Sequence, residues 1–123
     1  PYHKKIVEAI HSFGKPAILH SCGNLVEVMD EIIDDMKYDG KHSYEDKILP
    51  VEEAYRKYFP RIAILGGIDL DFVCRSTPEE ISMRCGKMIE LTHGCTGYAL
   101  GTGNSVPDYV PIENYFALIE SVG

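Results

Sequence analysis

The residues best suited to chemistry in this 123-residue chain are His20 and Cys22, in the stretch His20-Ser21-Cys22-Gly23-Asn24. They follow the apolar run Ala17-Ile18-Leu19, which has the length and composition of a buried strand. Residues two apart in a strand point to the same face, so we expect this imidazole and this thiol to project together beyond the strand's carboxyl end. Such a pair can bind a soft metal ion or activate sulfur as a nucleophile.

Strand and helix patterns alternate along the whole chain. Strands are predicted at residues 16–20, 62–65 and 97–101, with a weaker one at 38–43. Helices are predicted near residues 6–13, 25–36, 50–58, 77–89 and 111–119, because apolar residues recur there at helical spacing. This rhythm predicts an α/β fold with a parallel sheet and right-handed crossovers. A small doubly wound sheet fits, and so does half of an eight-stranded TIM-type barrel, which needs about 250 residues when complete.

Polar or glycine-rich segments follow all four predicted strands, at residues 20–24, 42–46, 66–69 and 101–105. Parallel α/β folds keep their chemistry at the carboxyl ends of their strands. In a barrel these four loops would form one side of the active-site mouth, so the loops favour the barrel, with parallel strands and outer helices.

Composition limits the possible partners. The net charge of −7 argues against nucleic acid or an anionic membrane surface. No apolar run approaches the roughly 20 residues of a membrane helix. The four cysteines show no disulfide-framework spacing, which predicts reduced thiols in a cytoplasmic protein.

Three stretches together resemble the uroporphyrinogen decarboxylase superfamily: residues 19–24 (LHSCGN), 65–69 (LGGID) and 101–107 (GTGNSVP) leading to 111–114 (PIEN). This superfamily includes porphyrinogen decarboxylases and zinc-dependent methylcobamide:thiol methyltransferases. The resemblance spans the chain. It implies that residues 1–123 form a single partial domain, the C-terminal four strand–helix units of a TIM-type barrel whose N-terminal half is absent here.

The resemblance also implies site roles. The methyltransferase branch binds zinc through a His-x-Cys pair, matched by His20 and Cys22, and through a distant cysteine, whose position is taken here by Asn104. The decarboxylase branch usually has a histidine in that neighbourhood, so Asn104 departs from both branches. We expect catalytic roles for His20, Asp46 and Asn104. The methyl-transfer reading implies a small-molecule thiol substrate, a corrinoid as methyl donor or acceptor, and a corrinoid protein as partner.

A third ligand must come from elsewhere in the chain. Cys95 precedes the last strand and is expected roughly 15 Å from the site, at the wrong end of the sheet. Candidates at the correct end are His42, Glu45, Asp46 and Asp69. His42 follows the second strand as His20 follows the first, and Asp46 could complete the site or orient an imidazole.

The hypothesis is therefore a divalent metal, zinc in the methyltransferase branch, held by His20 and Cys22 with His42 or a carboxylate. One position would be left for a substrate sulfur or oxygen. The alternative is that His20 and Cys22 only form the end of a strand and bind no metal.

Substrate contacts are expected from the loops after the last two strands. The glycines there could bind an anionic group through backbone N–H groups, or could only let the backbone turn. Asp69 could bind substrate or metal, or only cap the following turn. The expected substrate-binding residues are Gly66, Gly67, Asp69, Gly101, Gly103 and Ser105.

The expected mouth is acidic, which favours methyl transfer over decarboxylation of a porphyrinogen that carries eight carboxylates. Decarboxylation, which needs no metal or cofactor, stays as an alternative, and so does a non-catalytic module that binds a corrinoid or tetrapyrrole. Unpaired edges at both ends of a half-barrel sheet predict self-association of the chain. The acidic residues are Glu45, Asp46, Asp69, Asp71 and Asp108, against the basic residues Lys41, Lys47 and Arg75.

Overall fold

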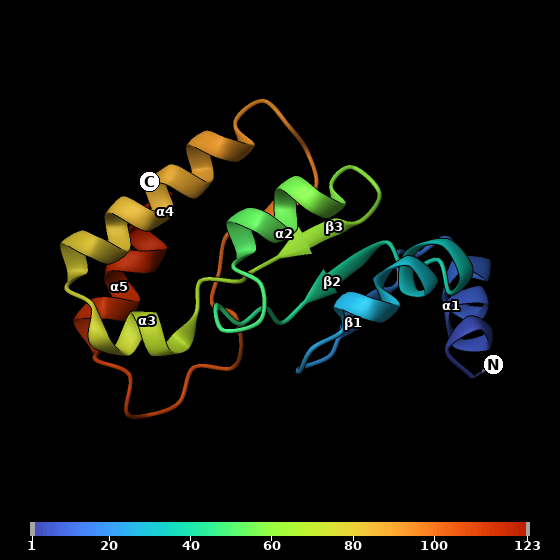
Figure 1. Cartoon of the computed structure of the whole chain (residues 1–123), viewed down its shortest axis with the longest axis horizontal. Helices are drawn as coiled ribbons and strands as arrows, with labels where there is room; N and C mark the ends of the chain where they lie inside the picture. The colour runs from blue at the N-terminus through green and yellow to red at the C-terminus, as the bar shows by residue number, and fades with distance from the viewer. Residues whose placement is uncertain (1, 123) are drawn as a thin grey trace.

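The computed structural model describes residues 2–122, and its centre is a parallel four-stranded sheet (Figure 1). The strands are β1 (Ile18–His20), β2 (Gly40–His42), β3 (Ala63–Leu65) and β4 (Tyr98–Ala99), and they lie side by side in the order β1-β2-β3-β4. Doubly wound sheets reverse their strand order at a switch point, whereas consecutive barrel strands do not. The observed order is therefore that of consecutive barrel strands.

Helices connect or flank these strands. They are α1 (Tyr2–Ser12), α2 (Val51–Tyr58), α3 (Leu70–Arg75), α4 (Pro78–Thr92) and α5 (Ile112–Glu120). In Figure 1, α1 lies at one end of the molecule, and α3, α4 and α5 gather at the other. Helix α4 begins at a capping box between Thr77 and Glu80, where the sequence predicts the start of a helix. No helix within residues 2–122 is long and apolar enough to span a membrane.

One face of the sheet packs on the helices and the other is open. Ile64 on the helix side is fully buried, together with Val51 of α2 and Ile81 of α4. On the opposite face Ile18 is 51% exposed. An apolar cleft runs along this face, lined by residues of all four strands and their flanks. The open face and the two sheet edges, β1 and β4, fit a partial barrel, and the predicted self-association stays a prediction.

The helix predicted at residues 25–36 forms only in pieces. A 3₁₀-helix covers Val26–Val28 and a π-helix covers Glu31–Asp35. Like charges four residues apart destabilise an α-helix, and this stretch has three such pairs. The pairs are Glu27 with Glu31, Asp30 with Asp34, and Glu31 with Asp35.

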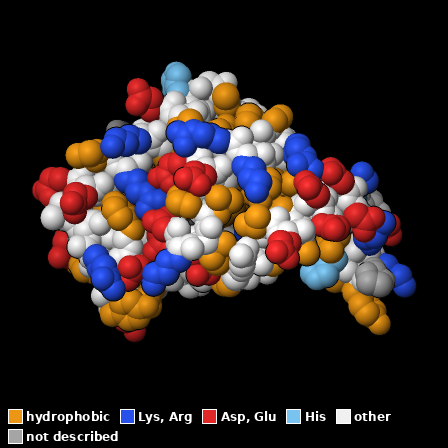
Figure 2. Space-filling model, viewed as in Figure 1, with side chains coloured by type: hydrophobic (Ala, Val, Ile, Leu, Met, Phe, Trp, Pro, Cys, Tyr) orange, Lys and Arg blue, Asp and Glu red, His pale blue; other side chains and the backbone are white. Residues whose placement is uncertain are grey.

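Basic residues from other parts of the chain form ion pairs with several of these acidic residues. Arg61 donates to Asp30 and Asp34, each at 2.7 Å, and Lys4 donates to Asp35 at 2.7 Å. Acidic and basic side chains are interspersed in the same way over the face in Figure 2. The segment is therefore held by tertiary ion pairs that hydrophobic periodicity does not reveal.

Candidate functional site

The register of the sheet places two histidines side by side at its carboxyl edge. His20 of β1 pairs with His42 of β2, and their Nδ1 atoms are 2.7 Å apart. His42 Nε2 lies 3.1 Å from the carbonyl oxygen of Thr102, which can only accept, so we assign the proton of a neutral His42 to Nε2. Its Nδ1 then accepts a hydrogen bond from His20 Nδ1. This leaves the Nε2 lone pair of His20 free.

That free nitrogen faces the sulfur of Cys22. His20 Nε2 and Cys22 Sγ are 3.9 Å apart, and both residues are exposed. A tetrahedral zinc ion with ordinary Zn–N and Zn–S bonds separates two such ligands by about 3.6 Å. The predicted projection of His20 and Cys22 to one side is confirmed, and their spacing fits two ligands of one metal ion.

Two side chains donate hydrogen bonds to the Cys22 sulfur. Asn104 Nδ2 lies 3.3 Å from Sγ, and Ser43 Oγ lies 3.4 Å from it. Asn104 comes from the loop after β4, so the structure brings together residues 82 positions apart, as the family resemblance implies. The Oδ1 atom of Asn104 accepts from the backbone N–H of Ser105 at 2.8 Å, so the amide presents a donor to the sulfur.

Both ring nitrogens of His42 are engaged in hydrogen bonds, and its expected role as a metal ligand stays a prediction. A metal-binding histidine usually gives its second N–H to a neighbouring acceptor that fixes the ring. His42 has that position relative to His20. It is therefore placed to orient the His20 ring.

Asp46 is engaged in ion pairs away from the histidines, and its expected catalytic or imidazole-orienting role stays a prediction. Both carboxylate oxygens of Asp46 accept hydrogen bonds from Arg84 of α4, at 2.6 and 2.8 Å. Arg84 also donates to Glu52, at 2.7 and 3.0 Å. Burial alone would lower the pKa of Arg84, but the two carboxylates raise it above its usual range. Asp46 thus belongs to a structural ion-pair cluster between its loop and the helix layer.

Asp69 caps a helix, which is one of its two predicted roles. Its Oδ1 accepts from the backbone N–H groups of Asp71 and Phe72 at 2.7 and 3.3 Å, and its Oδ2 accepts from the N–H of Asp46 at 2.8 Å. It begins α3, a helix that the apolar pattern does not predict. The side chain is committed to loop structure.

Glu45 has no ion-pair partner among residues 2–122, and unlike Asp69 it does not cap a helix. Its Oε1 lies 3.5 Å from the N–H of Gly23, the residue after Cys22. The described part of the chain contains no preassembled group of three His, Cys, Asp or Glu side chains around one point. His20 and Cys22 therefore stay two candidate ligands, and Glu45 is the acid whose side chain contacts the loop next to Cys22.

The glycines of the last two loops are required by the backbone. Gly66 has φ +67°, and a Cβ there would lie 2.9 Å from the His42 ring; Gly67 has φ +99°, and a Cβ there would overlap Val51. The N–H groups of Gly66 and Gly103 donate to the carbonyls of Ala99 and Ile68, so these two groups are not available to bind an anion. Substrate contacts from Gly67, Gly101 and Ser105 stay predictions.

A groove of about 590 Å³ opens beside Asn104, of the size that small-molecule sites have. Its charged lining residues are Glu45, Asp46, Asp69 and Asp71 against Lys47 and Arg75. Arg75 is paired with Asp71 at 2.9 Å. The predicted acidic character of the mouth is therefore present in the structure.

A sequence model described as uroporphyrinogen decarboxylase (URO-D) matches residues 1–123, which is the whole chain. The chain belongs to the URO-D family. No curated protein matches it. Among solved structures, it is similar to a methyltransferase from Methanosarcina mazei, with a TM-score of 0.71 and 21% sequence identity. The match covers 97% of this chain and 33% of that protein, so the chain spans about a third of its neighbour's length and has the fold of part of a TIM-type barrel.

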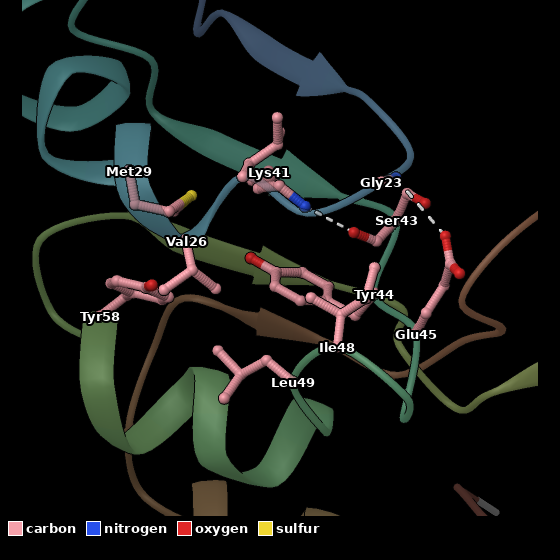
Figure 3. Close-up of a pocket in the computed structure, with 11 residues that line it drawn as sticks. Gly23, Val26, Met29, Lys41, Ser43, Tyr44, Glu45, Ile48, Leu49 and Tyr58 are labelled. Carbon is pink, nitrogen blue, oxygen red and sulfur yellow. Dashed lines mark hydrogen bonds between the residues drawn. The ribbon is translucent and has the colours of Figure 1, made fainter.

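In this URO-D barrel segment, the position of Lys41 differs from the prediction. The sequence places Lys41 at the acidic mouth, but its side chain is buried on the helix side of β2 and is only 4% exposed. Its Nζ donates to the carbonyl of Ser43 and lies 4.1 Å from the centroid of the Tyr44 ring (Figure 3). Strand alternation gives the signal that could have found this, because Lys41 must face opposite to His42.

Lys41 and Ser43 border a small, mainly apolar cavity (Figure 3). Its volume is about 30 Å³, room for little more than a water molecule. The hydroxyls of Tyr44 and Tyr58, which also line it, are buried without a hydrogen-bond partner among residues 2–122. A corrinoid does not fit in a cavity of this size.

The buried lysine predicts a pH dependence of stability. Burial lowers the pKa of Lys41 from its ordinary 10.5 to about 8, against the opposing effects of Cys22 and Glu45. Between these two pH values the unfolded chain binds more protons than the folded one, so the free energy of unfolding should rise with pH, by up to about 3 kcal/mol. Urea unfolding from pH 7 to 10.5 checks this. The rise should be absent in Lys41→Met, and an equal rise in both proteins would contradict the assignment.

Proposed function

We propose that this URO-D family protein takes part in metal-assisted transfer of a methyl group between a corrinoid and a thiol. The observation that carries the proposal is the pairing of His20 Nε2 and Cys22 Sγ at 3.9 Å, at the carboxyl edge of the sheet. The similarity to a methyltransferase structure supports the same reaction class. The chain spans only about a third of that neighbour, so the reaction belongs to a complete barrel.

Each residue of the site has a separate part in this proposal. His20 and Cys22 would hold a zinc ion, and Glu45 would turn in from the adjacent loop as the third ligand. His42 keeps the His20 ring oriented through the Nδ1–Nδ1 contact. When bound, the metal lowers the pKa of a substrate thiol so that it reacts as a thiolate.

Charge in the groove favours this reaction over porphyrinogen decarboxylation. The acidic side chains on the groove outnumber the basic ones, and the buried Lys41 does not face it. A substrate with many carboxylates would meet repulsion in such a partly enclosed site. A neutral or zwitterionic thiol would not.

Turnover with methylcobalamin and a panel of thiols tests the proposal on the intact protein. We expect S-methylated product from the unmodified protein and a loss of more than about 100-fold in Cys22→Ala. Cys95→Ala makes the same change at another exposed cysteine, which precedes β4, and should keep full activity. Tight corrinoid binding without turnover would instead favour a non-catalytic module, and release of CO₂ from a porphyrinogen would favour decarboxylation.

A further inference from the structure

Ser43 has an unusual conformation directly behind the Cys22 sulfur. Its φ is +81°, in a region that side-chain-bearing residues seldom occupy, and the residue is 3% exposed. Its hydroxyl donates to Cys22 Sγ at 3.4 Å. Backbone strain of this kind persists only where surrounding contacts hold it, and it concentrates at functional sites.

The contact that holds Ser43 comes from Lys41. The buried ammonium donates to the carbonyl of Ser43 and has no carboxylate partner among the described residues. A charged donor makes a stronger hydrogen bond than a neutral one, particularly away from water. The buried Lys41 ammonium thus holds the Ser43 backbone in place. That backbone conformation directs the Ser43 hydroxyl toward the Cys22 sulfur.

We infer that Ser43, positioned by Lys41, suppresses methylation of the protein's own Cys22, so that the transferred methyl group goes to the substrate sulfur. The inference rests on the proposed function, because it concerns the same sulfur. Asn104 adds a second donor to Cys22 Sγ at 3.3 Å. Ser43 and Lys41 are positioning residues, since neither is placed to touch the substrate.

The chemical problem is that two sulfurs compete for one methyl group. A methyl donor that reacts with Cys22 forms an S–CH₃ bond and breaks its bond to the leaving group, which keeps the electron pair. A hydrogen bond to the sulfur stabilises its charge and engages a lone pair that would otherwise attack the methyl group. Removing one donor should therefore speed the unwanted reaction by about threefold, as expected from losing part of one hydrogen bond.

Methyl iodide and zinc-loaded protein provide the test, with iodide as the leaving group. Zinc content is measured first, and S-methylation of Cys22 is then followed by mass spectrometry at fixed pH. We expect Ser43→Ala to react about threefold faster than the unmodified protein, and Lys41→Met to show part of this increase. Ser21→Ala is the matched control, because the Ser21 hydroxyl donates to the Cys22 carbonyl and not to its sulfur.

Ser43→Gly is a second variant in case Ser43→Ala folds poorly. Glycine adopts positive φ without strain and also lacks the hydroxyl. Faster methylation in either Ser43 variant, with zinc and circular dichroism unchanged, supports the inference. Equal or slower methylation in both variants overturns it and leaves the proposed function standing. Failure of the unmodified protein to bind zinc overturns both.

Discussion

Replacing Asn104 with cysteine is expected to raise the zinc affinity by about 100-fold. The Asn104 amide lies 3.3 Å from Cys22 Sγ, so a cysteine at this position would place a second thiolate beside the first. Two sulfurs on one tetrahedral zinc ion lie about 3.8 Å apart, which this geometry allows. The variant would complete a His-Cys-Cys set, and a third soft ligand strongly favours zinc. Competition with a chromophoric chelator measures the affinity.

The neighbouring Ser105 provides the control for this gain. Ser105→Cys introduces the same thiol one residue further along the loop, where the side chain is exposed and, among the described residues, makes no hydrogen bond to the Cys22 sulfur. We expect its zinc affinity to stay within about threefold of the unmodified protein. Equal gains in both variants would mean that the added thiol binds zinc without His20 and Cys22, which would contradict the site.

The second large effect concerns Arg84, whose replacement by methionine should destabilise the fold by about 3 kcal/mol. Its side chain is 15% exposed and pairs with Asp46 and Glu52, which are 31% and 23% exposed. Removing the cation leaves two carboxylates partly buried without their partner, which costs far more than the loss of a surface pair. Urea unfolding at pH 7 measures the change in the free energy of unfolding.

Arg75→Met is the matched variant for this experiment. Arg75 pairs with Asp71 within α3, and their side chains are 78% and 55% exposed. Its loss should change the free energy of unfolding by less than about 1 kcal/mol. If Arg84→Met were as mild as Arg75→Met, the assignment of Asp46 to a structural cluster would be wrong.

The fold was predictable because hydrophobic pattern and turn residues agree along most of the chain. The strand predicted at residues 62–65 and the helix predicted near residues 77–89 depend on local pattern, and both are present in the structure. The segment at residues 25–36 departs from the prediction because it depends on distant charges. Arg61 and Lys4 lie far from it in sequence, so periodicity alone could not predict its 3₁₀ and π geometry.

The site was predictable where strand geometry decides it. Alternation puts His20 and Cys22 on one side, and the family resemblance implies that Asn104 lies beside them. The role of Asp46 was not predictable, because its partner Arg84 lies 38 residues away on a helix. The contact of Ser43 with the Cys22 sulfur was not predicted, because it depends on a positive φ that the residue type does not indicate.

The central claim is that His20 and Cys22 hold a metal ion, and zinc content tests it most directly. The intact protein, purified with zinc present and then dialysed, is analysed by inductively coupled plasma mass spectrometry beside Cys22→Ala and Cys95→Ala. We predict stoichiometric zinc in the unmodified protein and in Cys95→Ala, and its loss in Cys22→Ala. Zinc content that is the same in Cys22→Ala as in the unmodified protein would contradict the account.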